Sequence, residues 1–260
     1  MTNKENKYVI QTVINAMKIL RLYSIEHQEL KISEIAEKLG LSEISTYRLC
    51  TTLTKYGYLE KKYRNGGYQL GISVLKLSGI IKTHWKAYRE EVRPILEKVN
   101  QELDKTVHFG ILEGRTIVYL EKYESSIPIQ LTSHIGFNNP AYCTASGLVI
   151  LAFSKNKVID SALPDQLQSF GPNTITDKGV LKNKVKEIKN KGYYIAFEET
   201  HEGVISIAVP VRDFTNEVIG AISLVLSSEV QTSQEELNYY IKILSKAATN
   251  LSEKLGYYRR

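Results

Sequence analysis

Two short groups of residues in the N-terminal third of the chain have side chains suited to contact with a nucleic acid duplex. Residues 42–48 combine hydroxyl groups with an arginine, and Arg48 can bind guanine or phosphate through two hydrogen bonds. A basic cluster follows beside Gly66, where lysine and arginine can hold phosphates or enter the minor groove. Together they predict a DNA interface made of Ser42, Glu43, Ile44, Ser45, Tyr47, Arg48, Lys61, Lys62 and Arg64.

The elements that must position these residues read as a helix-turn-helix followed by a two-stranded wing. Residues 32–39 form one amphipathic helix, which Gly40 ends, and Ser42 is the expected N-cap of the next. The inward residues of this second helix are Thr46, Leu49, Cys50 and Leu53. Residues 58–63 and 68–70 then read as two strands joined by a tight turn. This arrangement lays the start of the second helix in a DNA major groove.

We expect a specific DNA contact from each of two side chains at the start of the second helix. Arg48 is the best candidate for a contact with guanine or phosphate, and its alternative role is an ion pair on the helix surface. Ile44 is outward where a polar residue is more usual, so we expect it to touch thymine methyl groups.

The charge distribution agrees with a DNA-binding N-terminal domain. The chain has 34 lysines and arginines against 28 acidic residues, a net charge of +6. Residues 1–90 hold 15 basic and 8 acidic residues, a net of +7, whereas the remainder holds 19 and 20, a net of −1. Cations concentrated in one domain can replace the counterions of a phosphate backbone.

Composition limits the other classes of function. The 260 residues are 43% hydrophobic, which is enough for two domains with their own cores. No apolar run approaches the ~20 residues that cross a bilayer, so we expect a cytoplasmic protein with no membrane partner. The two cysteines, Cys50 and Cys143, fall in different predicted domains and cannot build a disulfide framework or a thiolate zinc site. We expect no cofactor.

Helical patterns surround the predicted DNA-binding motif. Residues 10–20 predict a first helix on which the other two pack, through a stripe of Ile10, Val13, Ile14, Met17 and Leu20. Residues 72–93 read as a connecting helix whose apolar residues, Leu75, Ile80, Ile81 and Trp85, are expected to pack against another subunit or domain. Pro94 is expected to start a new helix that runs to Leu103.

The pattern changes to strands after residue 105. Residues 106–113, 116–123, 127–132, 193–198, 204–212 and 218–226 are expected to be strands, and residues 145–153 and 177–191 helices. A last helix is expected to begin with a capping box between Thr232 and Glu235. Strands joined by tight turns, with helices between them, predict an α+β domain with an antiparallel sheet. The expected domains are 1–73, a linker helix over 74–90, and 91–260.

The order and spacing of five motifs resemble the IclR family of bacterial transcription regulators over nearly the whole chain. The motifs are residues 45–49 with Leu53 and Gly57, residues 68–71, residues 140–147, Gly192-Tyr193 with Glu198-Glu199 and Gly203, and residues 207–211. The resemblance implies a winged helix-turn-helix, a linker helix and a GAF-like domain that binds a small effector. It further implies a regulator that binds a double-stranded operator as a homodimer or a dimer of dimers. We expect a repressor, with an activator as the alternative.

By the same resemblance, the effector pocket lies between the sheet and the segment entering the buried helix at residue 145. The implied contacts are Ile129, Leu131, Thr144, Ala145, Ser146, Gly147, Ala196, Ser206, Ala208, Ser223 and Val225. Main-chain amides at a helix start favour an anion. The alternative is that the serines are ordinary sheet residues and the alanines plain core.

Two departures from the family pattern affect the expected effector. Leu148 replaces a usual lysine, and Ala196 with Phe197 replaces common acidic residues. Because a methyl group cannot make the lost hydrogen bond, we expect a small organic acid with a more apolar remainder than glyoxylate or pyruvate, with Phe197, Ile129 and Leu131 around it. The alternative is a neutral or aromatic inducer without a carboxylate.

An enzyme or a thiol-based sensor is the alternative from a different class. Cys143 could pair with His108, His134 or His201 as a nucleophile with its base, or hold a metal with one of them. No sequence signature links these residues, and the predicted domain has no second cysteine to resolve a sulfenic acid. Glu198 and Glu199, as neighbours on a strand, would point to opposite faces and could not act as a dyad.

Overall fold

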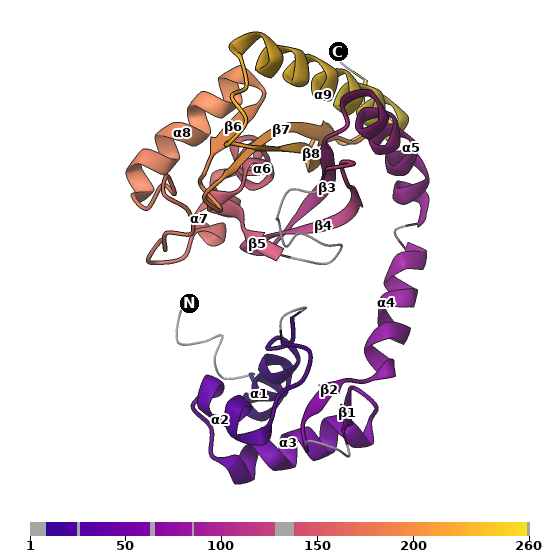
Figure 1. The fold of residues 1–260 in the computed structure, drawn as a ribbon, viewed down its shortest axis with the longest axis vertical. Helices are drawn as coiled ribbons and strands as arrows, with labels where there is room; N and C mark the ends of the chain where they lie inside the picture. The colour runs from indigo at the N-terminus through magenta and orange to yellow at the C-terminus, as the bar shows by residue number, and fades with distance from the viewer. Residues whose placement is uncertain (1–8, 25–26, 63–65, 85, 128–137, 259–260) are drawn as a thin grey trace. The chain divides into compact units, whose positions relative to one another are not determined.

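The structure is a computed structural model that describes residues 9–24, 27–62, 66–84, 86–127 and 138–258, with only the backbone for 81–84, 86–87 and 138. The chain divides into two compact units, Met1–Lys86 and Ala87–Arg260 (Figure 1). The expected strand at residues 127–132 lies almost wholly outside the described residues, as do Ile129, Leu131 and His134.

The first unit is a helix-turn-helix with a wing. Its elements are α1 (Gln11–Leu20), α2 (Ile32–Leu39), α3 (Glu43–Lys55), β1 (Leu59–Lys61), β2 (Tyr68–Leu70) and α4 (Ile72–His84). Gly40 ends α2 in the left-handed conformation, with φ of 63°, as expected for a C-terminal glycine. The core contains Ile19, Leu30, Ile35, Cys50, Leu53, Leu59 and Tyr68. Leu30 and Tyr68 exchange backbone hydrogen bonds, which attach the wing to the helices.

The expected inward stripe of α1 is confirmed only in part: the helix is present and Leu20 packs on the core, but three other members of the stripe do not. Ile10, Val13 and Met17 are exposed, whereas Ile19 is fully buried and Ala16 and Leu20 pack beside it. The predicted residues have helical spacing, but α1 has apolar residues on two faces. Spacing alone does not show which of these faces packs on the core. An apolar face on α1 is therefore left open.

The region around Pro94 also differs from expectation. Pro94 does not start a helix but lies inside α5 (Lys86–Leu103), and α4 ends at His84. A proline in a helix removes one hydrogen bond. The helix continues because Val92, Ile95, Leu96 and Val99 are buried against the sheet of the second unit.

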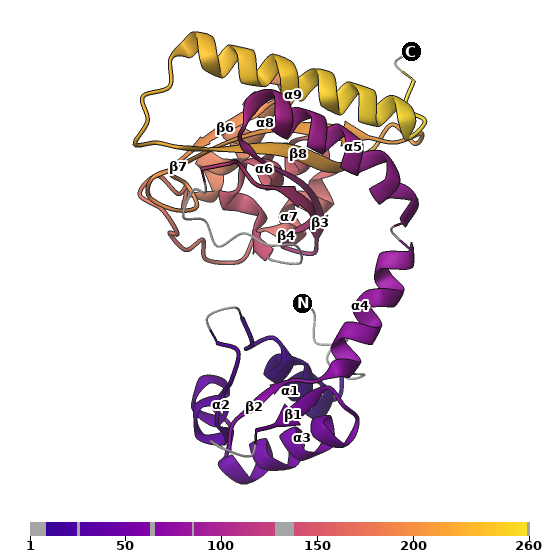
Figure 2. The ribbon, with the colours of Figure 1, turned by 45° about the vertical axis from the view of Figure 1, so that its right-hand side comes forward.

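The second unit contains a six-stranded antiparallel sheet in the order β5-β4-β3-β8-β7-β6. The strands are β3 (Thr106–Glu113), β4 (Thr116–Tyr123), β5 (Asn138–Pro140), β6 (Tyr194–Phe197), β7 (Val204–Arg212) and β8 (Val218–Ser227). The short edge strand β5 was not expected from the sequence. Figure 2 shows α5 and α9 (Gln234–Lys254) on one face of this sheet.

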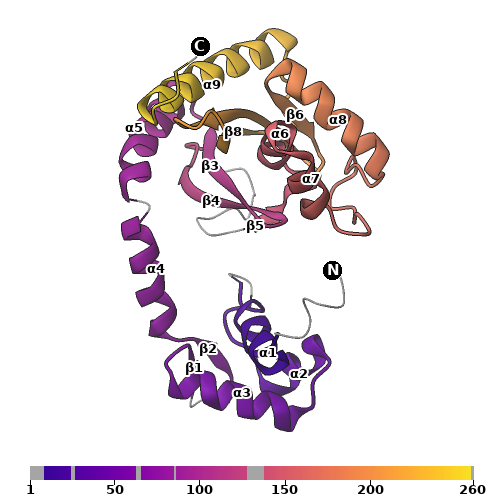
Figure 3. The same ribbon diagram turned by 180° about the vertical axis from the view of Figure 1, so that it is seen from behind.

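The other face of the sheet packs on α6 (Ala145–Phe153), and α8 (Lys178–Lys191) packs against α6, as Figure 3 shows from behind. α6 is buried on nearly all sides, which agrees with its expected position. A short α7 (Asn156–Ala162), not expected from the sequence, follows it. A 3-10 turn, Ala141–Cys143, leads from β5 into α6.

The capping box of α9 lies one residue later than expected. Ser233, not Thr232, is the N-cap: its Oγ accepts from the Glu236 amide, and the Glu236 carboxylate accepts from the Ser233 amide. Both pairs have the capping-box spacing, so the sequence offers two overlapping starts. Ser233 has the extended backbone that an N-cap needs.

Candidate functional site

The start of α3 presents the predicted DNA contacts on its open side. Ser42 caps the helix, since its Oγ accepts from the Ser45 amide at 3.2 Å. The predicted inward residues Thr46, Cys50 and Leu53 are buried, which fixes the rotation of the helix. As a result Ser42, Glu43, Ile44, Ser45, Tyr47 and Arg48 are all exposed.

The exposed Arg48 guanidinium is available for a contact with DNA. Within the described part of the chain its guanidinium forms no ion pair, so the surface ion-pair role has no partner there. In the wing, Lys61 and Lys62 are exposed, and the Lys61 Nζ lies 5.9 Å from the centre of the Tyr68 ring. Arg64 lies outside the described residues. The first unit thus offers a helix start and a basic hairpin on exposed surfaces.

A small cavity of about 30 Å³ lies in the second unit between the sheet and the start of α6. Six predicted effector contacts line it: Thr144, Ala145, Ser146, Ser206, Ser223 and Val225. The sheet register explains how the strand residues meet, because Ser206 on β7 lies opposite Val225 on β8. Ser223 and Val225, two residues apart on one strand, share a face.

The first turn of α6 supplies polar groups to this cavity. Thr144 is the N-cap, and its Oγ1 accepts from the Gly147 amide at 3.1 Å. The Ala145 and Ser146 amides belong to the first turn, whose N–H groups have no acceptor within a helix. The Ser146 hydroxyl is 1% exposed and has no hydrogen-bond partner among the described residues. A buried hydroxyl without a partner is costly unless a ligand or water completes it.

Three predicted effector residues that the structure describes do not line the cavity. Gly147 lies against the turn before α6, where a Cβ would come within 2.1 Å of the Ala141 carbonyl oxygen. Ala196 and Ala208 are buried in the core between the sheet and α6. Phe197, expected to surround the ligand, is half exposed.

Five lining residues were missed by the sequence analysis: His108, Tyr119, Asn139, Thr200 and Val204. His108 lies opposite Ser223 in the pairing of β3 with β8, and its ring centre is 4.6 Å from that of Tyr119. Burial, with a smaller effect from Lys122, lowers the pKa of His108 to about 3. Burial raises the pKa of Tyr119 to about 12, although a hydrogen bond with Asn139 opposes this shift. Both side chains are therefore uncharged near neutral pH.

The sequence predicts which face of its strand each of these residues occupies, but not which residues of other strands lie beside it. His108 and Tyr119 lie on strands that the sequence predicted, and strand alternation gives the face of each. It does not say that β8 inserts beside β3, and this pairing brings His108 to Ser223.

The environment of Cys143 disfavours thiol chemistry. Its side chain is fully buried, and burial raises the pKa of the thiol to about 12. The reactive form of a cysteine is the thiolate, which such a pKa suppresses at neutral pH. In the described ranges no group of three or more histidine, cysteine or acidic side chains could hold a metal ion.

Glu198 and Glu199 lie in the loop after β6, not on the strand where the sequence placed them. Glu198 has a positive φ of 53°, and its Oε1 accepts from the Gly203 amide and the Ser228 hydroxyl. Glu199 is buried, and its Oε1 accepts a short hydrogen bond from the Tyr194 hydroxyl. Burial raises the pKa of Glu199 to about 7. The two carboxylates therefore have separate partners.

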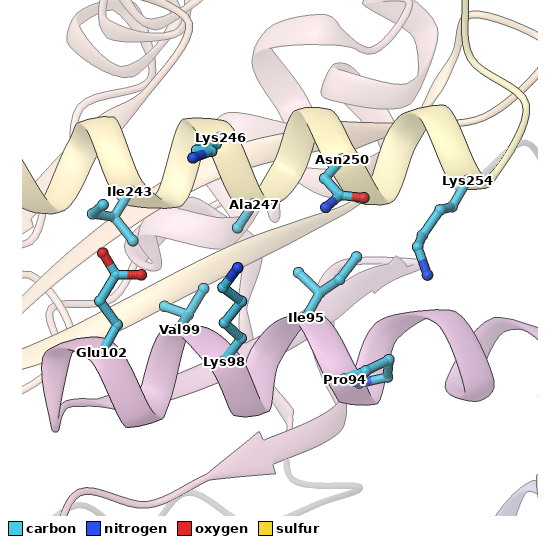
Figure 4. Close-up of a pocket in the computed structure, with 10 residues that line it drawn as sticks. All are labelled: Pro94, Ile95, Lys98, Val99, Glu102, Ile243, Lys246, Ala247, Asn250 and Lys254. Carbon is cyan, nitrogen blue, oxygen red and sulfur yellow. The ribbon is translucent and has the colours of Figure 1, made fainter.

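A larger groove of about 280 Å³ runs between α5 and α9. Figure 4 shows Ile95 and Val99 of α5 pointing toward α9, with Lys98 and Lys246 among the polar residues around them. No predicted site residue lines this groove. No helix of the described part is both long and apolar enough to span a membrane.

Comparison with known proteins assigns both units. The family model for the IclR helix-turn-helix domain matches residues 12–62, and the model for the bacterial transcriptional regulator IclR C-terminal domain matches residues 84–253. The HTH-type transcriptional regulator XynR of Escherichia coli is 32% identical, over 96% of this chain and 98% of its own length.

Solved structures agree with the family models. IclR of Thermotoga maritima, 28% identical, matches with a TM-score of 0.70 over 95% of this chain and 99% of its own. An IclR homolog from Microbacterium hydrocarbonoxydans, solved with 4-hydroxybenzoate and 22% identical, has the same fold, with a TM-score of 0.76 over 94% and 98% of the two chains. The relatives compared by sequence are named as transcriptional regulators. The chain belongs to the IclR family of bacterial transcriptional regulators.

Proposed function

We propose that this protein is a repressor whose affinity for a double-stranded operator is controlled by a small organic acid bound in the cavity. The observation that carries the proposal is the Ser146 hydroxyl, which is buried beside the first amides of α6 without a hydrogen-bond partner in the described part of the chain. Helix-start amides favour an anion, and the Ser206 and Ser223 hydroxyls line the same space. This function places the protein in the cytoplasm, with DNA and the effector as partners and without a cofactor.

The cavity lining also suggests the remainder of the acid. No charged side chain lines the cavity among the described residues, while Val204, Val225 and the Tyr119 ring supply apolar surface. This favours an acid with an apolar remainder over a very polar one. A structural relative is bound to 4-hydroxybenzoate, an aromatic acid. The uncharged lining would also accept a neutral inducer, which is the second candidate.

A thermal-shift screen separates the two candidates. A specific ligand at 100 times its dissociation constant should stabilise the native protein by ~2.7 kcal/mol. We expect small carboxylic acids with apolar groups to raise the melting temperature and the corresponding amides or alcohols not to. A response to neutral compounds alone would support the second candidate and reject the acid.

The Ser146→Ala variant tests the cavity directly. It removes a hydroxyl that has no partner, so the ligand-free protein should be at least as stable as wild type, while the stabilisation by the acid should fall. Ser154→Ala, at the other end of α6, is the matched control and should keep the full response. An unchanged acid response in Ser146→Ala would reject this site. Loss of operator binding on adding the acid, measured by fluorescence anisotropy, tests the repressor role.

The proposed assembly is a homodimer that can pair into a dimer of dimers. One winged helix reads too few base pairs to find a single site among ~10⁶ competitors, so a two-fold assembly is expected. The open face of α1 and the exposed residues Leu75 and Ile80 of α4 are apolar surfaces that such an interface could cover. The expected contacts of Ile81 and Trp85 lie outside the described side chains.

Mutation of α1 tests this interface. Val13→Glu should shift the protein toward monomer in sedimentation at micromolar concentration, because it places a charge on the apolar face. Thr12→Glu, on an exposed neighbouring position of the same helix, should leave the assembly unchanged. A wild-type protein that is monomeric on a palindromic operator would reject the dimer.

A further inference from the structure

Two large apolar side chains at the start of the proposed recognition helix are exposed. Ile44 is 76% exposed and Tyr47 is 52% exposed. Neither belongs to the buried cluster of the first unit or packs at its margin. They are three residues apart on α3, so they are neighbours on one face of the helix. Arg48, one turn after Ile44, extends the same exposed surface.

The chemistry of the major groove leaves few places for an isoleucine. Base edges there present hydrogen-bond donors and acceptors, with one apolar feature, the 5-methyl group of thymine. An aliphatic side chain set against a donor or acceptor removes it from water without replacing the hydrogen bond. Set against a methyl group, it buries two apolar groups and leaves no polar atom unpaired.

We propose that Ile44, with Tyr47 beside it, makes this protein a reader of pyrimidine 5-methyl groups, so that each operator half-site requires a thymine methyl at the start of α3. This inference rests on the proposed function as a DNA-binding regulator. It adds the chemical feature that is recognised: a methyl group, read by apolar contact and not by a hydrogen bond.

The helix geometry also fixes where the neighbouring contact falls. Ile44 and Arg48 are separated by four residues, which is about 6 Å along a helix that rises 1.5 Å per residue. Base pairs are spaced at about 3.4 Å. The thymine read by Ile44 and the guanine or phosphate held by Arg48 therefore lie about one or two base pairs apart.

Removal of single methyl groups from the operator tests the proposal. The full-length protein is used to select its operator from a random duplex library, and each thymine is then replaced in turn by deoxyuridine. This replacement keeps the base pair and deletes only the methyl group. Affinity is measured by fluorescence anisotropy at one salt concentration.

We expect uracil at one or two positions per half-site to weaken binding about fourfold each, which corresponds to ~0.8 kcal/mol for one buried methyl-sized group. In Ile44→Ala the same replacements should have almost no effect, because the contact is already lost. Val180→Ala, which truncates an exposed branched residue in the first turn of α8, is the matched control and should keep the full uracil effect. Cytosine methylated at C5, placed at the sensitive position, should restore part of the affinity relative to cytosine.

Three results would overturn the proposal. An operator without thymine in the positions next to the Arg48 contact would exclude the proposed methyl contact. Uracil replacements that never weaken binding would exclude it too. Uracil effects that persist unchanged in Ile44→Ala would assign the methyl contact to another residue. In each of these cases the protein still binds DNA, so the proposed function stands. If no duplex is enriched at all, both the proposed function and this inference fail.

Discussion

His108 on β3 lies directly opposite Ser223 on β8, and both side chains line the cavity beside α6. Because burial lowers the pKa of His108 to about 3, its ring is neutral near pH 7. An anionic ligand would therefore be held by amides and hydroxyl groups and not by an imidazolium charge. The same burial links His108 to the stability of the fold.

Acid should weaken the fold through His108. The pKa of His108 is about 3 in the folded protein and about 6.5 in the unfolded chain. Between these two pH values the unfolded chain therefore binds a proton at His108 that the folded protein does not. The contribution of the neutral His108 ring to stability is complete above pH 6.5 and is lost as the pH falls from there toward 3. Between pH 8 and pH 5 the loss is about 2 kcal/mol. In urea unfolding at both pH values, the change in stability from pH 8 to pH 5 should be more favourable in His108→Gln than in wild type by about 2 kcal/mol, and an equal change in the two proteins would contradict this.

Glu199 should act in the opposite direction. Burial raises its folded pKa to about 7 from 4.5, so its protonated form stabilises the fold at low pH. This contribution is present below pH 4.5 and is lost as the pH rises through about 7, at a cost on the order of 2–3 kcal/mol between pH 5 and pH 8. Glu199→Gln keeps an oxygen acceptor for the Tyr194 hydroxyl and does not titrate.

The Glu199→Gln protein should therefore gain stability relative to wild type as the pH rises. Because the contributions of His108 and Glu199 oppose each other, wild type should show a weaker dependence on pH over this range than either variant. Glu217→Gln, an exposed glutamate in a surface ion pair with Lys155, is the control and should follow the wild-type curve.

Arg48 and Lys62 should affect DNA binding differently. Arg48→Ala should weaken operator binding by ~1–3 kcal/mol if the guanidinium reads a base, and should relax the preference at that base. Lys62→Ala should weaken binding to all sequences alike. It should also reduce by about 1 the slope of the logarithm of the binding constant against the logarithm of the salt concentration. The exposed Lys182 of the second unit supplies a control, since Lys182→Ala should change neither quantity. Unchanged operator binding by both variants would remove α3 and the wing from the interface.

Gly147 should tolerate no side chain. A Cβ there would lie 2.1 Å from the Ala141 carbonyl oxygen, a backbone atom that cannot rotate away. Gly147→Ala should lower the free energy of unfolding by about 1–3 kcal/mol and reduce the response to ligand, because the start of α6 must shift. Gly79→Ala in α4, where a Cβ meets no atom of the described residues within 4 Å, should instead stabilise its helix by roughly 1 kcal/mol. Equal melting temperatures for Gly147→Ala and wild type would contradict the close packing.

Local signals in the sequence were sufficient for the elements that carry the interface. The positions of Thr46, Cys50 and Leu53 predicted the buried side of α3, and Gly40 predicted the end of α2. Burial of those three residues necessarily exposes Ile44 and Arg48, because a helix has a fixed period. The antiparallel α+β class followed in the same way from strand runs and tight turns.

Some local signals had two solutions, and packing chose between them. Thr232 and Ser233 both have a glutamate three residues later, and it is Ser233 that has an extended backbone and exchanges the capping-box hydrogen bonds with Glu236. Apolar residues occur on two faces of α1, and the face with Ile19 reached the core. Pro94 can start a helix or interrupt one, and burial of its neighbours kept α5 continuous.

The sequence by itself determined the two kinds of domain, because their elements depend on residues close together in the chain, and its resemblance to the IclR family implied six of the proposed ligand contacts. Tertiary structure alone decided that β8 lies between β3 and β7, which brings His108, Ser223 and Ser206 to one cavity. Alternation along a strand fixes the face of a side chain but not its neighbours on other strands. Those neighbours depend on pairing between segments more than a hundred residues apart, for which a single sequence carries no local signal.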